Sequence, residues 1–149
     1  MSAEFALRRY RTSDEDAAIE LWRRTWQLAY PEIDFTARVA WWRKRWREEL
    51  VPRAKIIVAE QNQRLAGFVT IDGSGYLDQL VVAPEAQGSA LATMLIDETK
   101  TLSPDGITLL VNTDNARAIR FYEKNSFHHA GEDVNPTSGR KVLKMTWGK

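Results

Sequence analysis

Three short apolar runs follow one another closely in the middle of the chain and limit the possible fold most. Lys55 to Glu60 and Leu65 to Asp72 are joined by a polar turn at Gln61-Asn62-Gln63, and Tyr76 to Ala83 follows a Gly-Ser-Gly turn. Apolar runs of strand length joined by polar or glycine-rich turns are typical of consecutive antiparallel strands. We therefore expect an antiparallel sheet as the starting point of the fold.

Segments with helical spacing lie on both sides of these strands. Ser13 is expected to cap a first helix that ends before Pro31, and a second helix is expected from about Thr36 to Leu50, ended by Pro52. The other expected elements are a strand at Phe5–Tyr10, a helix from near Gly88, a strand at Ile107–Asn112, a helix at Asn115–Lys124 and closing strands at Phe127–Gly131 and Lys141–Trp147. The order β-α-α-β-β-β-α-β-α-β-β predicts a mixed α/β (α+β) fold, with a mostly antiparallel sheet flanked by helices.

The composition is that of a single-domain globular protein. The 149 residues, of which 44% are hydrophobic, fit one domain over residues 1–149 with a sizeable core. Lysine and arginine number 21 and aspartate and glutamate 20, so we expect neither nucleic acid nor a membrane as a partner. The apolar runs are too short for a signal peptide or a membrane span, which predicts a cytoplasmic protein.

The residue types also exclude several chemistries. The chain has no cysteine, which removes disulfides, thiolate nucleophiles and cysteine-based metal sites. Its histidines, His128 and His129, are adjacent and cannot alone make an ordinary zinc site, so we expect no metal. As general bases they are weak candidates, because a histidine just after a helix is more often a surface residue.

The segment from Leu80 to Ala92 indicates a binding site. A buried strand ends at Pro84, and a run of small residues then opens a helix. The first turn of a helix has free backbone N–H groups, and small side chains let a phosphate approach them. Small residues at a helix start also serve close packing, and the residues alone leave both interpretations open. The sequence has no P-loop lysine and no G-x-G-x-x-G pattern.

This segment resembles the acetyl-CoA motif of the GCN5-related N-acetyltransferase (GNAT) superfamily, a strand ending L-x-V-x-P followed by Q/R-x-x-G-x-G/A at the head of a helix. The matching residues are Leu80, Val82, Pro84, Gln87 and Ala92, with Gly88 as a common additional match. Ala90 stands where the family usually has glycine. Its N–H stays available if its backbone is helical, although the added Cβ would crowd a pyrophosphate.

A second resemblance to the same family lies downstream, in its N-x-x-A-x-x-F-Y-E-K-x-G-F segment. The match runs through Asn115, Ala118, Phe121, Tyr122, Glu123, Lys124 and Phe127. Ser126 replaces the usual glycine, so the turn after this helix is expected to be altered. The resemblance implies a GNAT fold and acetyl-CoA as co-substrate. The coenzyme contacts that it implies are Leu80, Val81, Val82, Gln87, Gly88, Ser89, Ala90, Leu91, Ala92, Asn115, Ala118, Phe121 and Tyr122.

Tyr122 is the residue to which the resemblance gives the clearest catalytic role. Its hydroxyl is implied to face the coenzyme sulfur, where a phenol can protonate the departing thiolate as general acid. The alternative is a packed tyrosine whose hydroxyl finds some other partner. Asn115 is implied to contact the coenzyme or to orient the tyrosine helix, and plain capping of that helix is compatible with either role.

The strand before the binding loop supplies the other catalytic candidates. In this family the strand splays from its neighbour, so the backbones of Leu80 and Val82 would be free for the pantetheine arm, with the Leu80 N–H as oxyanion donor. Ordinary strand pairing is the alternative. The amine must lose a proton before it attacks, and Asp78, two residues before Leu80, is our candidate base. A water chain could also take that proton, and Asp78 could be no more than a solvated carboxylate near the strand entry.

The first two expected helices are rich in tryptophan and arginine. Trp22, Trp42 and Trp46 fit the apolar stripes and are expected in the core, whereas Trp41 lies off its stripe by about 100°. Trp41 is therefore expected to line a substrate groove or an oligomer contact, such as that of a homodimer. The second helix also carries a basic run, which we interpret as a solvated face rather than a nucleic-acid site: Arg43, Lys44, Arg45 and Arg47.

The sequence thus predicts an N-acetyltransferase that moves an acetyl group from acetyl-CoA to a primary amine of a small molecule or peptide. Direct attack in a ternary complex fits a chain without cysteine. A non-catalytic acyl-CoA-binding module or sensor and a basic-helix nucleic-acid binder are the alternatives. Residues 56–99 carry one basic and six acidic residues, which favours a cationic amine, but the basic helix argues the opposite.

Overall fold

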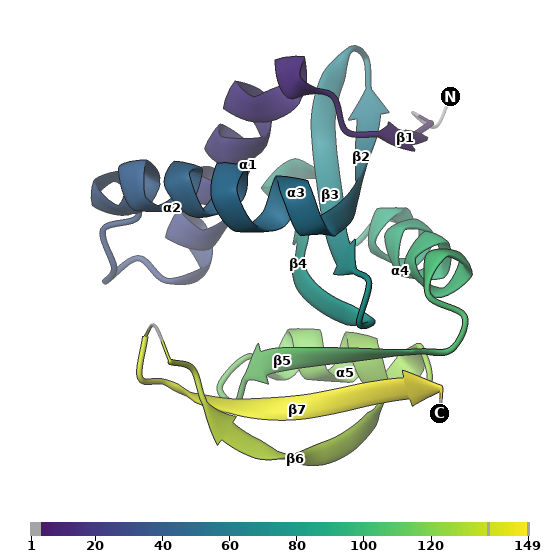
Figure 1. Ribbon diagram of the computed structural model, residues 1–149. Coiled ribbons are helices and arrows are strands. Elements are labelled where there is room, and N and C mark those ends of the chain that lie inside the picture. The colour runs from purple at the N-terminus through teal and green to yellow at the C-terminus, as the bar shows by residue number, and fades with distance from the viewer. Residues whose placement is uncertain (1–3, 137, 149) are drawn as a thin grey trace.

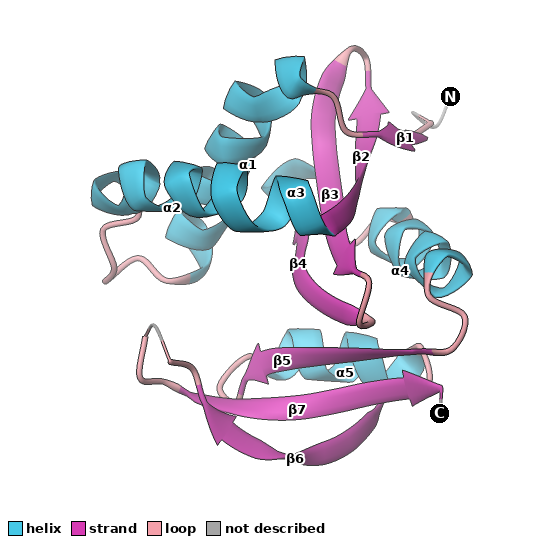
Figure 2. Cartoon of the chain, viewed as in Figure 1, coloured by secondary structure: helices cyan, strands magenta, loops and turns pink. Residues whose placement is uncertain are grey.

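The computed structural model describes residues 4–136 and 138–148 and contains a seven-stranded sheet. The strands run in the spatial order β1-β2-β3-β4-β5-β7-β6, in which β4 and β5 are parallel and the other neighbours antiparallel. The strands are β1 Ala6–Arg9, β2 Ala54–Gln61, β3 Arg64–Asp72, β4 Tyr76–Val82, β5 Gly106–Asn112, β6 His128–Val134 and β7 Lys141–Gly148. The mixed, mostly antiparallel sheet and its flanking helices are as expected (Figure 2).

Helices cover both faces of the first half of the sheet. They are α1 Glu15–Ala29, α2 Val39–Arg45, α3 Val51–Arg53, α4 Leu91–Leu102 and α5 Ala116–Lys124. The first three lie together on one side of β2, β3 and β4, and α4 lies on the other (Figure 1). The remaining helix, α5, lies behind β5 and β7 in that view. Each half of the sheet therefore has its own helical cover.

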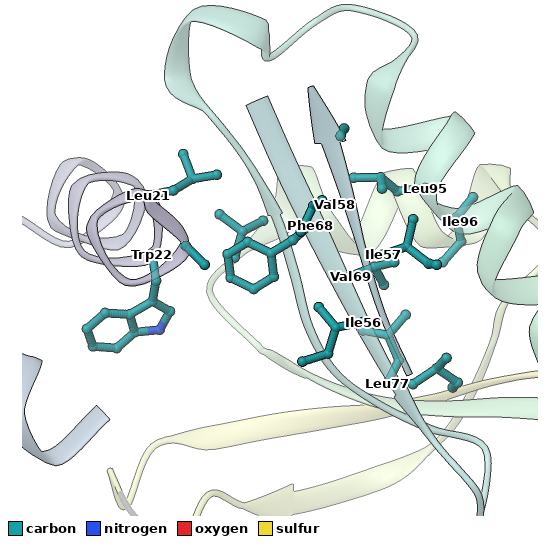
Figure 3. Packing of buried hydrophobic residues seen from close by; sticks show 14 of the residues in the cluster. Leu21, Trp22, Ile56, Ile57, Val58, Phe68, Val69, Leu77, Leu95 and Ile96 are labelled. Atoms are coloured by element: carbon teal, nitrogen blue, oxygen red, sulfur yellow. The ribbon is translucent and has the colours of Figure 1, made fainter. Parts of the chain in front are cut away.

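The core follows the alternation of side chains along β3. Phe68 lies toward Leu21 and Trp22 of α1, whereas Val69 lies toward Leu95 of α4 (Figure 3). All of these residues are buried, and Phe68, Val69 and Leu95 have no exposed surface. Successive side chains of a strand point to opposite faces, so a strand covered on both faces reads as a continuous apolar run. The Leu65–Asp72 run, which predicted a strand, is apolar throughout its middle for this reason.

The two halves of the sheet diverge where β4 leaves β5. Their parallel pairing consists of Tyr76 with Thr108 and Leu77 with Leu109, after which the strands separate (Figure 1). A bulge lies at the same place. Thr70 of β3 pairs with Gln79, but the next residue, Ile71, pairs with Leu77 rather than with Asp78. A bulge bends the strand and increases its local twist. The bend turns the rest of β4 away from β5 and leaves one of its edges unpaired.

Several expected boundaries were wrong, for identifiable reasons. Ser13 does not cap α1: the preceding residues form a 3-10 turn at Thr12–Asp14, and the Asp14 carboxylate accepts the Arg11 N–H at 2.8 Å. The second expected helix is in three parts, since a π-helical segment at Trp46–Leu50 separates α2 from α3. Pro52 sits in the first turn of α3, where its missing N–H costs nothing, so the helix continues to its end one residue later.

In the described part of the chain, every helix is too short or too polar to cross a bilayer.

Candidate active site

The gap between β4 and β5 continues into a cleft of about 380 Å³. Side chains of α1, α2, β4, β5, α5 and the segment between β6 and β7 line it. Among them are the predicted site residues Asp78, Leu80, Asn115, Ala118 and Tyr122. The structure therefore brings the proposed general acid, general base and oxyanion donor to one cavity.

The Leu80 N–H faces the unpaired edge of β4. Ala83 donates its N–H to Ala66 of β3 at 2.8 Å, and Gln79 donates to the Thr70 hydroxyl of the same strand at 3.1 Å. Backbone N–H groups alternate between the two edges of a strand, so Leu80 and Val82 point the other way, toward β5. Because β4 and β5 have already separated there, no strand accepts these bonds. The splayed geometry that the resemblance implied is present.

The loop between β4 and α4 offers a cluster of free N–H groups. Ser89 donates its N–H to the Ala86 carbonyl at 3.2 Å, and Leu91 donates to the Ser89 hydroxyl at 3.2 Å. Elsewhere in the loop and first helical turn, no acceptor within the described residues bonds the N–H groups of Gly88, Ala90, Ala92 and Thr93. Unpaired N–H groups at a helix start form an anion site.

Gly88 and Ala90 shape this loop in different ways. Gly88 has a φ of +83°, a left-handed conformation that favours glycine, and an added Cβ there would meet no protein atom within 4 Å. Ala90 has φ −74° and ψ −3°, so its backbone is helical, which is the condition under which its N–H was expected to stay available. The substitution at position 90 therefore preserves the backbone of the anion site. The helix itself begins at Leu91, three residues after the expected start.

Three of the residues implied to contact the coenzyme use their backbone N–H groups for hydrogen bonds within the protein. Val81 is 2% exposed and pairs with Phe68 of β3, so it has no free edge toward the cleft. The N–H groups of Ser89 and Leu91 have partners within the loop, as described above. The contacts of these three residues with the coenzyme therefore stay predictions, and they would have to use groups other than these N–H groups.

Sequence reasoning missed two groups next to the anion site. Arg117, in the first turn of α5, donates to the Gln87 side-chain oxygen at 3.1 Å, and the Gln87 amide donates to the Val82 carbonyl at 3.3 Å. This chain of bonds ties α5 to the loop and places a guanidinium beside it. Thr93 supplies a free N–H that a count of the first helical turn from Ala90 would have found.

Tyr122 is buried in the wall of the cleft, with 8% of its surface exposed. Its ring packs edge-on against Phe121 and Phe127, with centroids 5.3 and 5.4 Å away. Burial alone affects the titration of its hydroxyl, with no hydrogen bond to it from the described part of the chain. Burial raises the pKa of the phenol well above its ordinary value of 10.0, so the hydroxyl keeps its proton at neutral pH. A phenol that stays protonated and is aimed at a cavity can donate to a leaving group.

Asp78 is held by Arg45 at the end of α2. Two guanidinium nitrogens donate to its two carboxylate oxygens at 3.0 and 2.5 Å, and Gln79 donates to one of them at 3.0 Å. The guanidinium also lies 5.4 Å from the centre of a Trp42 ring, and its hydrogen bonds with Asp78 raise the pKa of Arg45. The carboxylate is therefore ion-paired rather than freely solvated, with 14% of its side chain exposed.

Asn115 caps α5, as one of the interpretations expected. Its side-chain oxygen accepts the Ala118 N–H at 3.2 Å. Asn115, Ala118 and Tyr122 are spaced at helical intervals and share the face of α5 that lines the cleft. The cap thus sets the start of the helix that carries Tyr122.

The tryptophans divide as expected between core and cleft. Trp22, Trp42 and Trp46 are 5%, 2% and 0% exposed, and the first two stack at 4.6 Å. Trp41 is 46% exposed and lines the cleft together with Trp22 and Trp42, and its role in a substrate groove stays a prediction.

The basic run on the second helix is largely neutralised within the protein. Arg43 and Arg47 bond Glu15 at 2.7 Å, and Arg45 bonds Asp78. These pairs remove much of the charge that a nucleic-acid backbone would contact. His128 and His129 are exposed, and His129 contacts Glu123 at 2.9 Å, away from the cleft.

Comparison with known proteins agrees with this geometry. A family model described as an acetyltransferase (GNAT) domain matches residues 32–148. The chain is 31% identical over 130 residues to the peptidyl-lysine N-acetyltransferase YjaB of Salmonella typhimurium, and the match covers 84% of each protein.

Two solved structures share the fold. A GCN5-related N-acetyltransferase from Rhodopseudomonas palustris has a TM-score of 0.84 at 21% identity, over 100% of this chain and 99% of that one. The PaiA N-acetyltransferase from Thermoplasma acidophilum, solved in complex with coenzyme A, has a TM-score of 0.74 at 20% identity, over 98% and 99%.

The splayed strands, the loop at the head of α4 and the family match define a protein of the acyltransferase class. The chain belongs to the GNAT family of acetyltransferases.

Proposed function

We propose that the protein transfers the acetyl group of acetyl-CoA to a primary amine, with the lysine side chain of a peptide as the favoured acceptor. One observation carries the reaction: the Tyr122 side chain and the unpaired edge of β4 at Leu80 line the same cleft. The name of the Salmonella relative, a peptidyl-lysine N-acetyltransferase, supports the choice of acceptor. A small-molecule amine is the alternative acceptor, and the cytoplasm is the expected compartment.

The residues present fit acetyl-CoA. The free N–H groups of Gly88, Ala90, Ala92 and Thr93 suit a pyrophosphate, with Arg117 as a nearby cation. The open edge of β4 suits an amide-containing arm, because Leu80 and Val82 can bond it as a strand would. When bound there, acetyl-CoA supplies an activated acetyl group as a thioester.

The Leu80 N–H and the Tyr122 hydroxyl act at opposite stages of the transfer. The N–H donates to the acetyl oxygen as negative charge develops on it during attack by the amine. The Tyr122 hydroxyl then gives its proton to the sulfur as the carbon–sulfur bond breaks. The attacking nitrogen, which is positively charged after it bonds the acetyl carbon, gives its extra proton to water, and the Tyr122 phenolate regains a proton from water. The products are an acetylated amine and free CoA thiol.

The amine must be neutral before it attacks, since an alkyl ammonium has a pKa of about 10. Asp78 lines the cleft but is bound by Arg45 through both oxygens. We therefore favour loss of the proton to water at the open mouth of the cleft, with Asp78 and Arg45 fixing the wall. Asp78 as direct base is the competing assignment, and a variant described in the Discussion separates the two.

The test is release of free CoA from acetyl-CoA in the presence of lysine peptides, peptide amino termini, polyamines, aminoglycosides and amino acids. We expect steady turnover without an initial burst, because no acyl-enzyme can form on cysteine in this chain. Mass spectrometry of the acceptor should show one added acetyl group on a lysine. Tight acetyl-CoA binding with no turnover of any amine would instead support a sensor.

A further inference from the structure

The cleft carries an excess of guanidinium groups at the end away from the anion loop. We call this the acceptor end and define it by Trp26, Tyr30, Phe35, Arg38 and Arg140, all of which line the cleft. Two of these five side chains are cationic and none is acidic.

The ion pairs of the other charged residues in the cleft do not cancel this excess of positive charge. Among the described lining residues, Asp78 is the carboxylate, and Arg45 already binds both of its oxygens. No carboxylate lining the cleft is therefore left to balance Arg38, and the two carboxylates that pair with Arg140 lie outside the cleft lining. A charge at a cleft wall that no neighbour balances raises the affinity for a ligand of opposite sign.

Arg38 has no ion-pair partner in the part of the chain that the structure describes. Its guanidinium carbon lies 5.5 Å from the centre of the Phe35 ring, in the geometry of a cation–π contact. Stacking of this kind fixes the plane of a guanidinium and leaves the N–H groups at its edge available. A fixed fork of N–H donors matches the two oxygens of a carboxylate.

Arg140 lies on the other side of the acceptor end. Its guanidinium carbon is 4.7 Å from the centre of the Tyr30 ring, so it too is stacked. Its acidic neighbours, Asp114 and Glu32, are each 3.4 Å away. These distances exceed the roughly 2.7–2.9 Å of a strong charge-assisted hydrogen bond. The Arg140 guanidinium is therefore held in place by its neighbours, and its N–H groups remain available to a ligand.

The aromatic rings beneath the two guanidinium groups form one packed unit. Trp26 stacks on Tyr30 at 5.7 Å and on Phe35 at 6.4 Å, so both supporting rings share a neighbour. The donors are therefore preorganised, which lowers the entropy lost when a ligand binds them.

We propose that the acceptor end selects amines that carry a carboxylate close to the reacting nitrogen, bound by Arg38 and, second to it, by Arg140. This inference rests on the proposed acetyl transfer to a primary amine. For a peptide acceptor, the carboxylate belongs to an aspartate or glutamate beside the acetylated lysine. For a free amino acid, it is the α-carboxylate.

The test compares matched acceptors that differ in one carboxylate. Blocked peptides with glutamate or glutamine on either side of a single lysine are assayed for kcat/KM at low salt, together with free lysine and lysine amide. We expect a preference of about tenfold or more for the glutamate peptide, the size of one charge-assisted hydrogen bond. The preference should shrink as sodium chloride is raised to 0.5 M, in a measurement that needs no variant.

Variants then assign the preference to its residue. Arg38→Gln should lower kcat/KM for the glutamate peptide, so that the ratio of kcat/KM between the glutamate and glutamine peptides falls close to one. Arg38→Lys should keep part of the preference for the glutamate peptide. The matched control is Arg53→Gln, an exposed arginine outside the cleft, which should keep the full ratio. A melting temperature equal to that of the parent shows that each variant is folded.

The possible outcomes separate this inference from the function on which it rests. Equal kcat/KM for the glutamate and glutamine peptides, with turnover of both, would overturn the inference and leave the acetyltransferase standing. A preference that survives Arg38→Gln would remove Arg38 as its source and also overturn it. A preference for lysine over lysine amide without one for the glutamate peptide would assign the site to free amino acids. No CoA release with any amine would overturn both proposals.

Discussion

The Arg45 guanidinium donates hydrogen bonds to both carboxylate oxygens of Asp78, at 3.0 and 2.5 Å, in the wall of the cleft. The pair joins α2 to β4 at the bulge where β4 turns away from β5. It therefore fixes the helix that lines the acceptor side relative to the strand that carries the oxyanion donor.

We predict that Asp78→Asn lowers the free energy of unfolding by about 1–2 kcal/mol, because it leaves a half-buried guanidinium without its counter-charge. If the pair is structural, kcat should fall less than tenfold and its pH profile should keep its shape. Urea unfolding and a pH–rate profile measure the two effects. A loss of 100-fold or more, together with loss of the rising limb of the profile, would make Asp78 the base. Arg45→Gln is the matched variant, since it breaks the same pair and keeps the carboxylate.

Tyr122→Phe tests the proton donor. It keeps the ring contacts with Phe121 and Phe127 and removes a hydroxyl that has no partner among the described residues. We expect kcat to fall by about 10²–10⁴-fold, toward the low end because a CoA thiol is only moderately basic. The KM for acetyl-CoA and the melting temperature should stay close to those of the parent. Unchanged kcat would show that another group protonates the thiolate.

Acetyl-CoA should stabilise the fold by binding at the loop between β4 and α4. At a hundredfold excess over Kd the gain is about 2.7 kcal/mol, which corresponds to about 5–10 °C in melting temperature. Gly88→Leu should reduce this shift, because the new side chain would fill the open space beside the free N–H groups and strain a positive φ.

Gly73→Leu is the control for added bulk, since Gly73 also lies in open space but without a positive φ. It should leave the acetyl-CoA shift as it is, and Ala90→Gly should leave it unchanged or enlarge it. Equal shifts in the parent and in Gly88→Leu would contradict the placement of the coenzyme in this loop.

Ser126→Gly should stabilise the protein. Ser126 follows α5 with a φ of +71°, a conformation that costs a residue with a Cβ roughly 1–2 kcal/mol and costs glycine little. The greater freedom of glycine in the unfolded chain offsets part of this, so we expect a net gain of about 0.5–1 kcal/mol by urea unfolding. Ser126→Ala keeps the Cβ and should bring no gain; an equal gain there would locate the strain elsewhere.

Glu15 makes part of the stability depend on pH. Its hydrogen bonds with Arg47 and Arg43 lower the pKa of its carboxyl to about 2, from 4.5. Because the folded-state pKa is the lower one, the contribution is complete above about pH 5 and is lost as the pH falls toward 2. Glu15→Gln should therefore cost about 1 kcal/mol at pH 7, a modest value because Arg47 is exposed.

Urea unfolding of both proteins from pH 7 to pH 3 measures this difference. It should shrink to under about half of its pH 7 value by pH 3. Glu48→Gln, at an exposed position of the π-helical segment Trp46–Leu50 that carries Arg47, should change little at either pH. A difference that stays constant with pH would mean that the ion pairs do not contribute.

Much of the fold followed from local patterns. The strands from Lys55 onward alternate with polar turns, and their order predicted the sheet because each is continuous in sequence. What escaped prediction depends on backbone irregularities and side-chain contacts that no residue pattern announces. The bulge opposite Ile71 has no signature in the Tyr76–Ala83 run, and Asp14 caps the first turn only because the chain brings Arg8 and Arg11 to its carboxylate.

The site, like the fold, has features that follow from local sequence and features that depend on the three-dimensional arrangement. The free N–H groups of the loop follow from a strand that stops at Pro84 and a helix that starts just beyond, both of which are local. The partner of Asp78 lies 33 residues away on α2, and nothing in the sequence joins them. Arg38 looked like one more exposed cation, and only its position against Phe35 in the cleft distinguishes it.

The unpaired edge of β4 lies inside the sheet rather than at its border. Exposed borders invite strands of other molecules to add to them, and such addition leads to aggregation. Here β5 and the amino-terminal helices stand on either side of the gap. A strand of another folded protein cannot enter this gap, whereas a thin, flexible molecule that carries amide groups can. Under the proposed function, acetyl-CoA completes the hydrogen bonding of this β4 edge while it is bound, and the edge is unpaired again each time CoA leaves.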